Sequence, residues 1–159
     1  MAKQAAGILL YRQGSRGLEV LLAHPGGPLW AKKDLGAWTI PKGQFGNGES
    51  ALEAAKREFE EEMGSPANGE FAELGSIKQP SGKVVYAFTA ESDFDVQTVK
   101  SNLFTLEWPP KSGREGRFPE VDRAGWFSID EARKRILKGQ EPFIDRLLTL
   151  LKVTADGSS

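Results

Sequence analysis

The segment from residue 43 to residue 64 constrains the fold more than any other part of the chain, because it joins a glycine-rich loop to a helix with clear limits. Ser50 and Glu53 have the spacing of a capping box, in which side chains satisfy the free N–H groups at a helix start. Gly64 suits the left-handed residue that often follows a helix end. Apolar side chains recur between these signals at helical spacing, at Leu52, Ala55, Phe59 and Met63. The pattern predicts a helix over about residues 50–63 with one buried side.

Segments with strand character lie on both sides of this helix. They are rich in β-branched, aromatic and aliphatic residues and are bounded by glycine, proline or polar residues. We expect strands at residues 5–12, 18–24, 37–40, 71–78, 83–91, 102–108 and 124–127. Two more helices are expected near residues 129–138 and 142–152, and a polar loop at residues 109–119. This mixture predicts an α/β or α+β fold with helices on the faces of a mixed sheet.

The length of the chain, 159 residues, suits one domain with one hydrophobic core. No internal repeat and no change of composition marks a domain boundary. We therefore expect a single domain over residues 1–159, with its core at about 5–152 and a flexible tail at 153–159.

Charge and cysteine content exclude several classes of function. The formal net charge of −1 gives no field for non-specific binding to extended nucleic acids. The chain has no cysteine, which excludes disulfides, thiolate metal sites and cysteine nucleophiles. Its apolar start is too short for a signal peptide, and no stretch reaches membrane-spanning length. These features predict a cytoplasmic protein with no membrane partner.

Three glutamates share one face of the predicted helix, because Glu58, Glu61 and Glu62 are three and four residues apart. Their charges repel each other, and they lie in the last turns, where the helix dipole also disfavours anions. A bound divalent cation would reverse these penalties, and carboxylate oxygens are ligands that magnesium and manganese prefer. Taken alone, an acidic run of this kind is also compatible with a solvated helix face.

The loop and the helix together carry a spaced pattern of fixed residues. It reads Gly43-x5-Glu49-x7-Arg57-Glu58-Phe59-x-Glu61-Glu62-x-Gly64. The pattern resembles the Nudix box, and every fixed position matches. Only the bulky apolar residue after the last glycine is replaced, by Ser65, and we expect no effect on chemistry because that position serves packing. The resemblance favours metal binding over the solvated-face alternative.

The resemblance implies a hydrolase that uses a divalent metal, Mg²⁺ or Mn²⁺, to cut a pyrophosphate bond in a nucleotide-like substrate. It also implies a Nudix-type α/β/α sandwich, in which the loop and helix form the metal platform. The acids that match metal-binding or water-ordering positions are Glu58, Glu61 and Glu62. The carbonyl of Gly43 matches a further metal ligand.

Three other residues acquire a role only through the resemblance. Arg57 and Glu49 match the pair that holds the loop against the helix, and Lys42 matches a lysine that often contacts phosphate. In the implied mechanism, divalent ions neutralise the diphosphate and lower the pKa of a bound water.

The resemblance implies one more acid, on a loop shortly before a strand that contains tryptophan. Glu120 lies six residues before Trp126 and has the expected spacing, and Glu115 and Asp122 are the alternatives. Relatives differ in which acid serves as general base, so both Glu58 and Glu120 are candidates.

The polar loop expected before this acid is a candidate for substrate contact. Lys111, Arg114 and Arg117 would hold phosphates. Trp108, at the start of the loop, would offer a flat surface for a base. The alternative is a solvated loop beside a core tryptophan. His24 is the only histidine, and we expect it at a strand end or in a loop.

Features outside the box bear on the substrate. Residues 24–28 and 107–110 resemble a subgroup of predicted NTP pyrophosphohydrolases, and the chain is more distantly similar to diadenosine tetraphosphate hydrolases. The tyrosine expected in the latter is not securely matched, because Tyr86 is displaced by one position. We therefore expect a nucleoside or dinucleoside polyphosphate as substrate, with ADP-ribose or a nucleotide sugar as the alternative. A non-catalytic Nudix-fold binding domain is disfavoured, because all the acids of the box are present.

Overall fold

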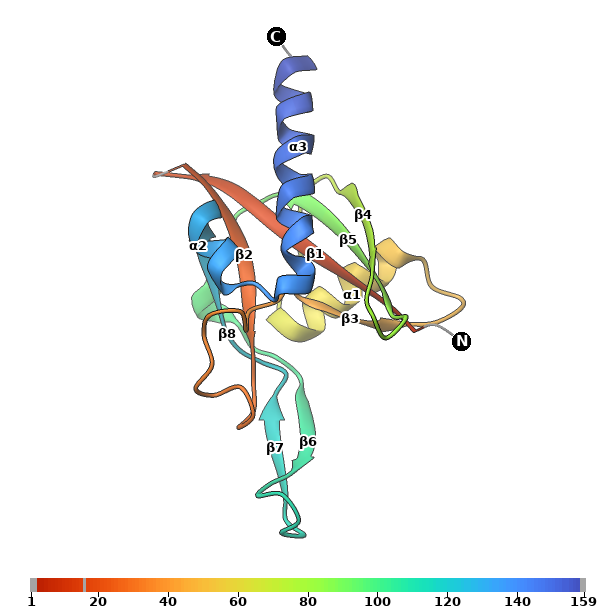
Figure 1. Cartoon of the computed structure of the whole chain (residues 1–159), viewed down its shortest axis with the longest axis vertical. Helices are drawn as coiled ribbons and strands as arrows, with labels where there is room; N and C mark the ends of the chain where they lie inside the picture. Colours follow the sequence, from red (N-terminus) through yellow and green to blue (C-terminus); the bar gives the residue numbers. More distant parts are fainter. Residues whose placement is uncertain (1–2, 16, 158–159) are drawn as a thin grey trace.

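The computed structural model describes residues 3–15 and 17–157, with side chains as far as residue 152. The main sheet has the strand order β4-β5-β1-β2-β8, and β3 pairs with β1 (Figure 1). Its strands are β1 (Gln4–Gly14), β2 (Gly17–Pro25), β3 (Lys42–Phe45), β4 (Ala72–Lys78), β5 (Val84–Glu91) and β8 (Val121–Ser128). β1 and β5 are parallel, whereas the other pairs are antiparallel. The expected mixed sheet is confirmed.

β1 lies at the centre of the sheet and has two partners along one edge. Its first residues, Gln4–Gly7, pair with β3, and its last residues, Tyr11–Gly14, pair with β2. β5 pairs with the other edge from Gln4 to Tyr11. The sheet therefore forks beside β1, with β3 and β2 along different parts of the same edge.

Helices cover both faces of the sheet. α1 (Ala51–Met63) lies on one face, and α2 (Ile129–Arg135) and α3 (Glu141–Gly157) lie on the other. β1 serves both cores because successive side chains point to opposite faces. On the α1 side the core includes Ala6, Ile8, Leu10, Phe59 and Met63. On the α3 side it includes Ala5, Leu9, Phe143, Ile144 and Leu147. The result is the expected three-layer α/β/α sandwich.

The limits of α1 follow from the local signals in its sequence. The Ser50 hydroxyl accepts a hydrogen bond from the Glu53 N–H at 3.1 Å. At the other end Gly64 has φ 86°, and its N–H donates to the Glu60 carbonyl at 2.8 Å. A residue with a Cβ would be strained in this left-handed conformation. The predicted helix is confirmed to within one residue.

The strand expected at residues 37–40 is not formed. Thr39 makes an isolated bridge with Ala23, and Trp38 makes one with Ile136. The strand in this region is β3, which begins after Pro41 in the expected glycine-rich loop. Pairing with β1 decides this outcome, because proline has no N–H to donate and the ladder begins at the next residue.

The prediction of a polar loop at residues 109–119 is also wrong for the second half of this range. Glu115–Pro119 forms β7, which pairs with β6 (Leu103–Glu107) in a hairpin that projects from the body (Figure 1). The side chains of Phe104 and Phe118 are cross-strand partners on one face of this hairpin. The turn is closed by the Glu107 carboxylate, which accepts hydrogen bonds from two backbone N–H groups, those of Lys111 and Gly113.

The ends of the last two helices differ from expectation. α2 stops at Arg135 rather than near 138, because Ile136 is extended and bridges to Trp38. α3 continues to Gly157, beyond the expected end near 152. Of the tail expected at 153–159, the last two residues and all side chains lie outside the described residues. Among the described helices, none has the length and apolar character needed to cross a membrane.

Candidate functional site

A single arginine ties the glycine-rich loop to α1. The Arg57 guanidinium donates two hydrogen bonds to Glu49, from Nε at 2.8 Å and from Nη2 at 2.9 Å. Its Nη1 also donates to Glu58 at 2.8 Å and to Glu61 at 3.3 Å. The paired bonds to Glu49 are the geometry in which a planar guanidinium holds a carboxylate most firmly. The loop carbonyl of Gln44 accepts a further, longer bond at 3.5 Å.

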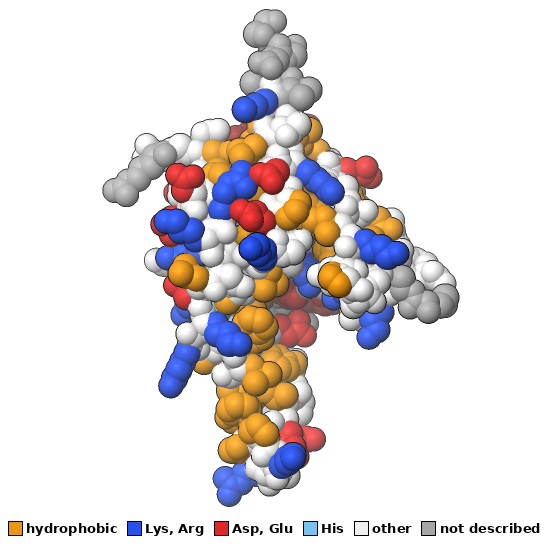
Figure 2. Space-filling view, in the orientation of Figure 1, with side chains coloured by type: hydrophobic (Ala, Val, Ile, Leu, Met, Phe, Trp, Pro, Cys, Tyr) orange, Lys and Arg blue, Asp and Glu red, His pale blue; other side chains and the backbone are white. Residues whose placement is uncertain are grey.

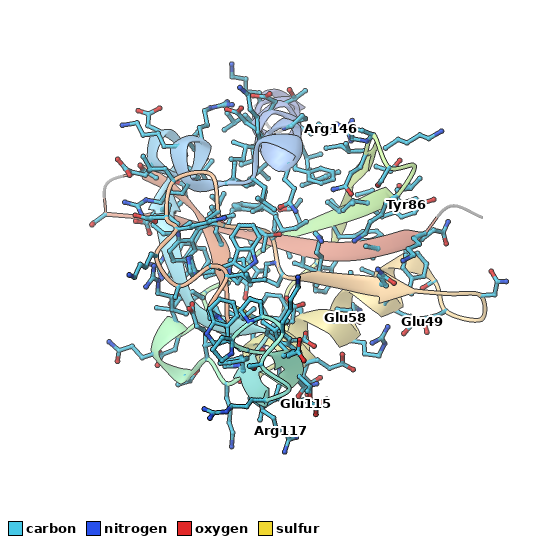
Figure 3. The ribbon with its side chains drawn as sticks, turned by 60° about the horizontal axis from the view of Figure 1, so that its bottom comes forward. Glu49, Glu58, Tyr86, Glu115, Arg117 and Arg146 are labelled. Carbon is cyan, nitrogen blue, oxygen red and sulfur yellow. The ribbon has the colours of Figure 1, made fainter. Side chains whose placement is uncertain are left out.

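Gly43 lets the backbone of β3 approach the acidic face of α1. A Cβ added at Gly43 would collide with the carboxylate of Glu58. Glycine therefore suits this close contact between strand and helix, because a larger residue would force the Glu58 carboxylate to move. Figure 3 shows Glu58 and Glu49 together on this side of the molecule, away from Arg146 of α3.

Glu62 is the most perturbed acid of the site. It is buried, and its Oε1 accepts a hydrogen bond from the backbone N–H of Lys42 at 3.2 Å. Burial, followed by the negative charges of Glu120 and Glu58, raises the pKa of Glu62 to about 8. Taking a carboxylate out of water and placing it beside other carboxylates both disfavour the ionised form.

The same forces act on the neighbouring acids. Burial raises the pKa of Glu58, with a contribution from Glu61, and the bond from Arg57 opposes this shift. The pKa of Glu120 is also raised, by burial first and then by Glu58 and Glu61. Glu120 lies between β7 and β8, far from α1 in the sequence, yet its charge acts on the helix acids. The fold therefore brings this fourth acid to the face formed by α1.

Backbone contacts fix the position of Glu120. Its N–H donates to the Asn102 carbonyl at 2.9 Å, and its carbonyl accepts from the Gly26 N–H at 2.9 Å. Of the two alternatives, Glu115 lies in β7 near the hairpin turn, and Asp122 contacts His24. Neither is among the main causes of the raised pKa values of Glu58 and Glu62.

The chemistry of the acidic residues fits a divalent cation. They offer hard oxygen ligands that repel each other, and a cation removes that repulsion. Within the described residues, no three acidic or histidine side chains already converge on one point. Arg57 draws the carboxylates of Glu58 and Glu61 toward itself, and the Lys42 amide holds that of Glu62. Binding an ion would therefore require side-chain rotation.

A second lysine, Lys83, lies near Lys42. Burial lowers the pKa of the Lys42 ammonium, and the nearby charge of Lys83 lowers it further. The two lysine side chains contact each other, and the negative charges of Glu62 and Glu58 oppose the lowering of the Lys42 pKa. Sequence reasoning missed Lys83, because it approaches Lys42 only through the side-by-side arrangement of β3, β1 and β5. Two half-buried cations close together are suited to an anion such as phosphate, which would reduce the repulsion between them.

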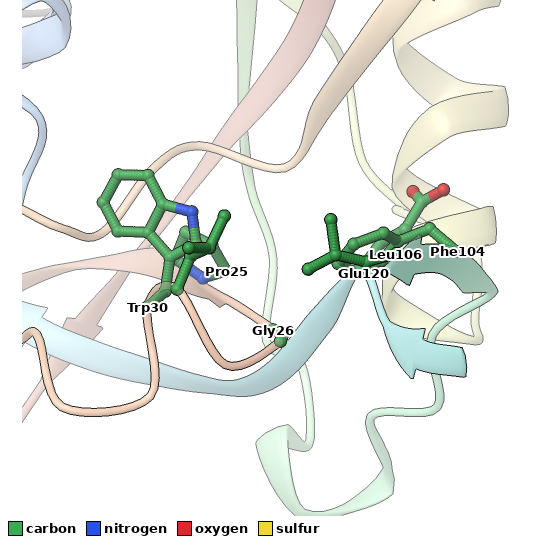
Figure 4. A pocket seen from close by; sticks show the side chains of 8 residues that line it. Pro25, Gly26, Trp30, Phe104, Leu106 and Glu120 are labelled. Carbon is green, nitrogen blue, oxygen red and sulfur yellow. The ribbon is translucent and has the colours of Figure 1, made fainter. Parts of the chain in front are cut away.

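A pocket of about 340 Å³ opens beside Glu120 (Figure 4). It lies between the loop that follows β2 and the β6–β7 hairpin. Its lining residues are Pro25, Gly26, Gly27, Leu29, Trp30, Phe104, Leu106 and Glu120. Trp30 lies on one side of the pocket, and Phe104, Leu106 and Glu120 lie on the other. The walls are mainly apolar, as expected of a site that binds a flat ring by stacking and burial.

The tryptophan in this pocket is not the one that the sequence suggested. Trp30 lines the pocket, and the Lys33 ammonium lies over its ring at 5.0 Å. Trp108 instead precedes the hairpin turn, where its backbone N–H donates to the Arg114 carbonyl at 2.9 Å. No local signal distinguished the two, because the pocket is formed by two segments far apart in the sequence.

The three basic residues expected to hold phosphates are not gathered at the acids. Lys111 and Arg114 are exposed at the hairpin turn. Arg117 pairs with Thr105 in the hairpin register and alternates with Phe118, so it lies on the face opposite the pocket lining. Figure 2 shows hydrophobic side chains along this projecting hairpin, with basic residues near its end. A role for these cations stays a prediction.

Comparisons with known proteins agree with this fold. A family model described as NUDIX domain matches residues 1–147. A C. elegans Ap4A hydrolase in a binary complex has a TM-score of 0.63 at 21% identity, covering 93% of this chain and 98% of that one. The NUDIX domain of Shewanella oneidensis NrtR complexed with ADP ribose has a TM-score of 0.67 at 15% identity, covering 95% and 89%. A mutT/nudix family protein from Listeria innocua has a TM-score of 0.62 at 17% identity, covering 96% and 95%.

Proposed function

The chain belongs to the NUDIX domain family and is a Nudix hydrolase, and we propose that it cuts a pyrophosphate bond in a nucleoside or dinucleoside polyphosphate. One observation carries the proposal. The acids of α1 suit a divalent cation, and the charge of Glu120 acts on one of them, Glu62. Glu120 also lines a mainly apolar pocket, so the acids and the pocket are neighbours. A polyphosphate bound at the acids would thus have its nucleoside within reach of Trp30.

Nudix hydrolases generally use divalent metals, and we propose Mg²⁺ or Mn²⁺ here. The residues proposed to hold the metal are Gly43, through its carbonyl, and Glu58, Glu61, Glu62 and Glu120. When bound, the ions would neutralise the diphosphate and make water acidic enough to attack near neutral pH.

The chain itself supplies the binding and proton-transfer groups. Lys42 and Lys83, whose side chains lie close together, would bind phosphate oxygens. Arg57 and Glu49 keep the loop in place. Glu58 and Glu120 both have raised pKa values, which favour proton uptake from an attacking water.

The direct test is a panel of nucleoside and dinucleoside polyphosphates with Mg²⁺, with products identified by chromatography. We expect turnover that is abolished by chelation and restored by magnesium. Glu62→Gln should lower the rate by roughly 10²-fold, the scale for losing a group that contacts the reacting centre. Glu60→Gln is the matched control, because it removes the same charge from an exposed position of the same helix. Hydrolysis that survives exhaustive chelation would overturn the proposed metal chemistry.

ADP-ribose or a nucleotide sugar is the second candidate. It is favoured by the similarity to the NUDIX domain of NrtR, which was crystallised with ADP ribose. The same panel separates the candidates, because ADP-ribose would yield AMP and ribose 5-phosphate. A kcat/KM for ADP-ribose above that for every polyphosphate would make it the substrate class.

A further inference from the structure

We propose that His24 is a positioning residue that sets the nucleoside pocket by linking the pocket loop to the start of β8, next to Glu120. The pocket loop is residues 26–34, which follow β2 and include Trp30. The inference rests on the proposed function, in which this pocket receives the nucleoside.

His24 is completely buried at the end of β2, and both ring nitrogens contact oxygen atoms. Nε2 lies 2.6 Å from the Lys33 carbonyl, and Nδ1 lies 2.9 Å from the Asp122 carboxylate. A carbonyl only accepts hydrogen bonds, so Nε2–H is the donor to Lys33. The Trp38 ring packs edge-on against the imidazole at 5.1 Å and limits its rotation.

One path of contacts leads from His24 to the aromatic wall of the pocket. The Lys33 carbonyl accepts a hydrogen bond from His24, and the Lys33 N–H donates one to the Trp30 carbonyl at 3.0 Å. The Lys33 ammonium also lies over the Trp30 ring at 5.0 Å. A shift of Lys33 would therefore move Trp30.

The other path leads from His24 to the opposite wall. Asp122, which contacts Nδ1, lies two residues after Glu120 in the chain. Glu120 in turn contacts the start of the pocket loop through the Gly26 N–H. A single buried ring thus joins the two segments whose separation defines the pocket.

The pocket loop has little packing of its own to replace this link. Leu29 is 57% exposed, and Leu35, just beyond the loop, is 69% exposed. Asp34 is anchored separately, by the Trp38 indole N–H at 2.7 Å and by Arg135 at 2.6 Å. Loss of the His24 link should therefore displace the middle of the loop while its far end stays attached.

Two amide substitutions separate the two paths. The side-chain nitrogen of asparagine is as many bonds from Cβ as Nδ1, and that of glutamine as many as Nε2. His24→Asn therefore keeps a donor near Asp122 and loses the donor to Lys33, whereas His24→Gln does the reverse. We expect KM for ATP or diadenosine tetraphosphate to rise roughly 10-fold in His24→Asn, because a backbone carbonyl loses its partner. In His24→Gln it should stay within about threefold, with kcat little changed in either variant.

The controls test whether the effect follows the proposed path. Leu35→Ala alters an exposed side chain outside the pocket lining, and its KM should be unchanged. If His24→Asn fails to fold, Lys33→Met tests the last contact of this path, because it removes the ammonium that lies over the Trp30 ring and leaves the backbone bonds in place; KM should rise here as well. Equal KM values for His24→Asn and His24→Gln, or an unchanged KM in Lys33→Met, would overturn the proposal. Absence of nucleotide turnover by the unsubstituted protein would instead overturn the proposed function, and with it the premise of this inference.

Discussion

At the scale of single residues, the site depends on one guanidinium that serves three carboxylates. Glu49 raises the pKa of Arg57 further above its ordinary value, so the positive charge is permanent. The same group contacts Glu58 and Glu61, and it lowers the repulsion between them. Arg57 therefore holds the loop in place and also partly neutralises the negative charge of the acidic face.

Arg57→Lys tests whether geometry or charge matters at this position. Lysine keeps the charge but has no planar fork, so it cannot make the paired bonds to Glu49. We expect kcat/KM to fall by roughly 10-fold or more, while Mg²⁺ still binds in a calorimetric titration. Lys56→Arg, on the exposed side of the same helix, is the control. Full activity of Arg57→Lys would show that the pairing is incidental.

At the scale of elements, the β6–β7 hairpin changes how the substrate site is understood. If this segment were a loop, Trp108 and the basic residues that follow it would lie near the proposed metal site. As a hairpin, it turns Phe104 and Leu106 toward the pocket and carries Trp108 toward the turn. The aromatic wall opposite the hairpin comes from Trp30, in the loop after β2.

Comparison of Trp30→Ala with Trp108→Ala decides which ring stacks on a base. Base–aromatic stacking contributes about 1–3 kcal/mol, so Trp30→Ala should raise KM roughly 10-fold. Trp108→Ala should change KM much less, because its ring does not line the pocket. The measurement is steady-state kinetics on the best nucleotide of the panel. A larger increase in KM for Trp108→Ala would show that the base stacks near the hairpin turn instead.

At the scale of the whole molecule, the acidic site unites elements that are distant in sequence. α1 supplies Glu58, Glu61 and Glu62, the junction of β7 and β8 supplies Glu120, and β3 supplies the amide that holds Glu62. Folding therefore concentrates negative charge in a partly buried place. That concentration has a free-energy cost, which appears as raised pKa values.

This cost predicts how stability depends on pH. The pKa of Glu62 rises from an ordinary 4.5 to about 8 on folding, so the folded protein binds this proton more tightly. The linked stabilisation is fully present below about pH 4.5 and is lost as pH rises through 8. With EDTA present, Tm should fall between pH 5 and 8, and Glu62→Gln should flatten this fall. A Tm that rises over this window, with no difference between the two proteins, would contradict the prediction.

Much of the box was determined by sequence alone, because its signals are local. Ser50, Glu53 and Gly64 bound the helix through contacts within one turn, and the spacing of Glu58, Glu61 and Glu62 places them on one face whatever surrounds it. Glu120 was predicted from the family resemblance, with its spacing before Trp126 as the guide, and the structure places it within electrostatic reach of these acids.

Pairing between distant segments decided the rest. β3 begins after Pro41 because β1 offers its edge there, and β7 exists because β6 lies beside it, although its own composition is that of a loop. Lys83, Trp30 and His24 acquired neighbours only when strands and loops far apart in the chain came together. Periodicity reports which face of an element is buried, but it carries no information about which other element will cover that face.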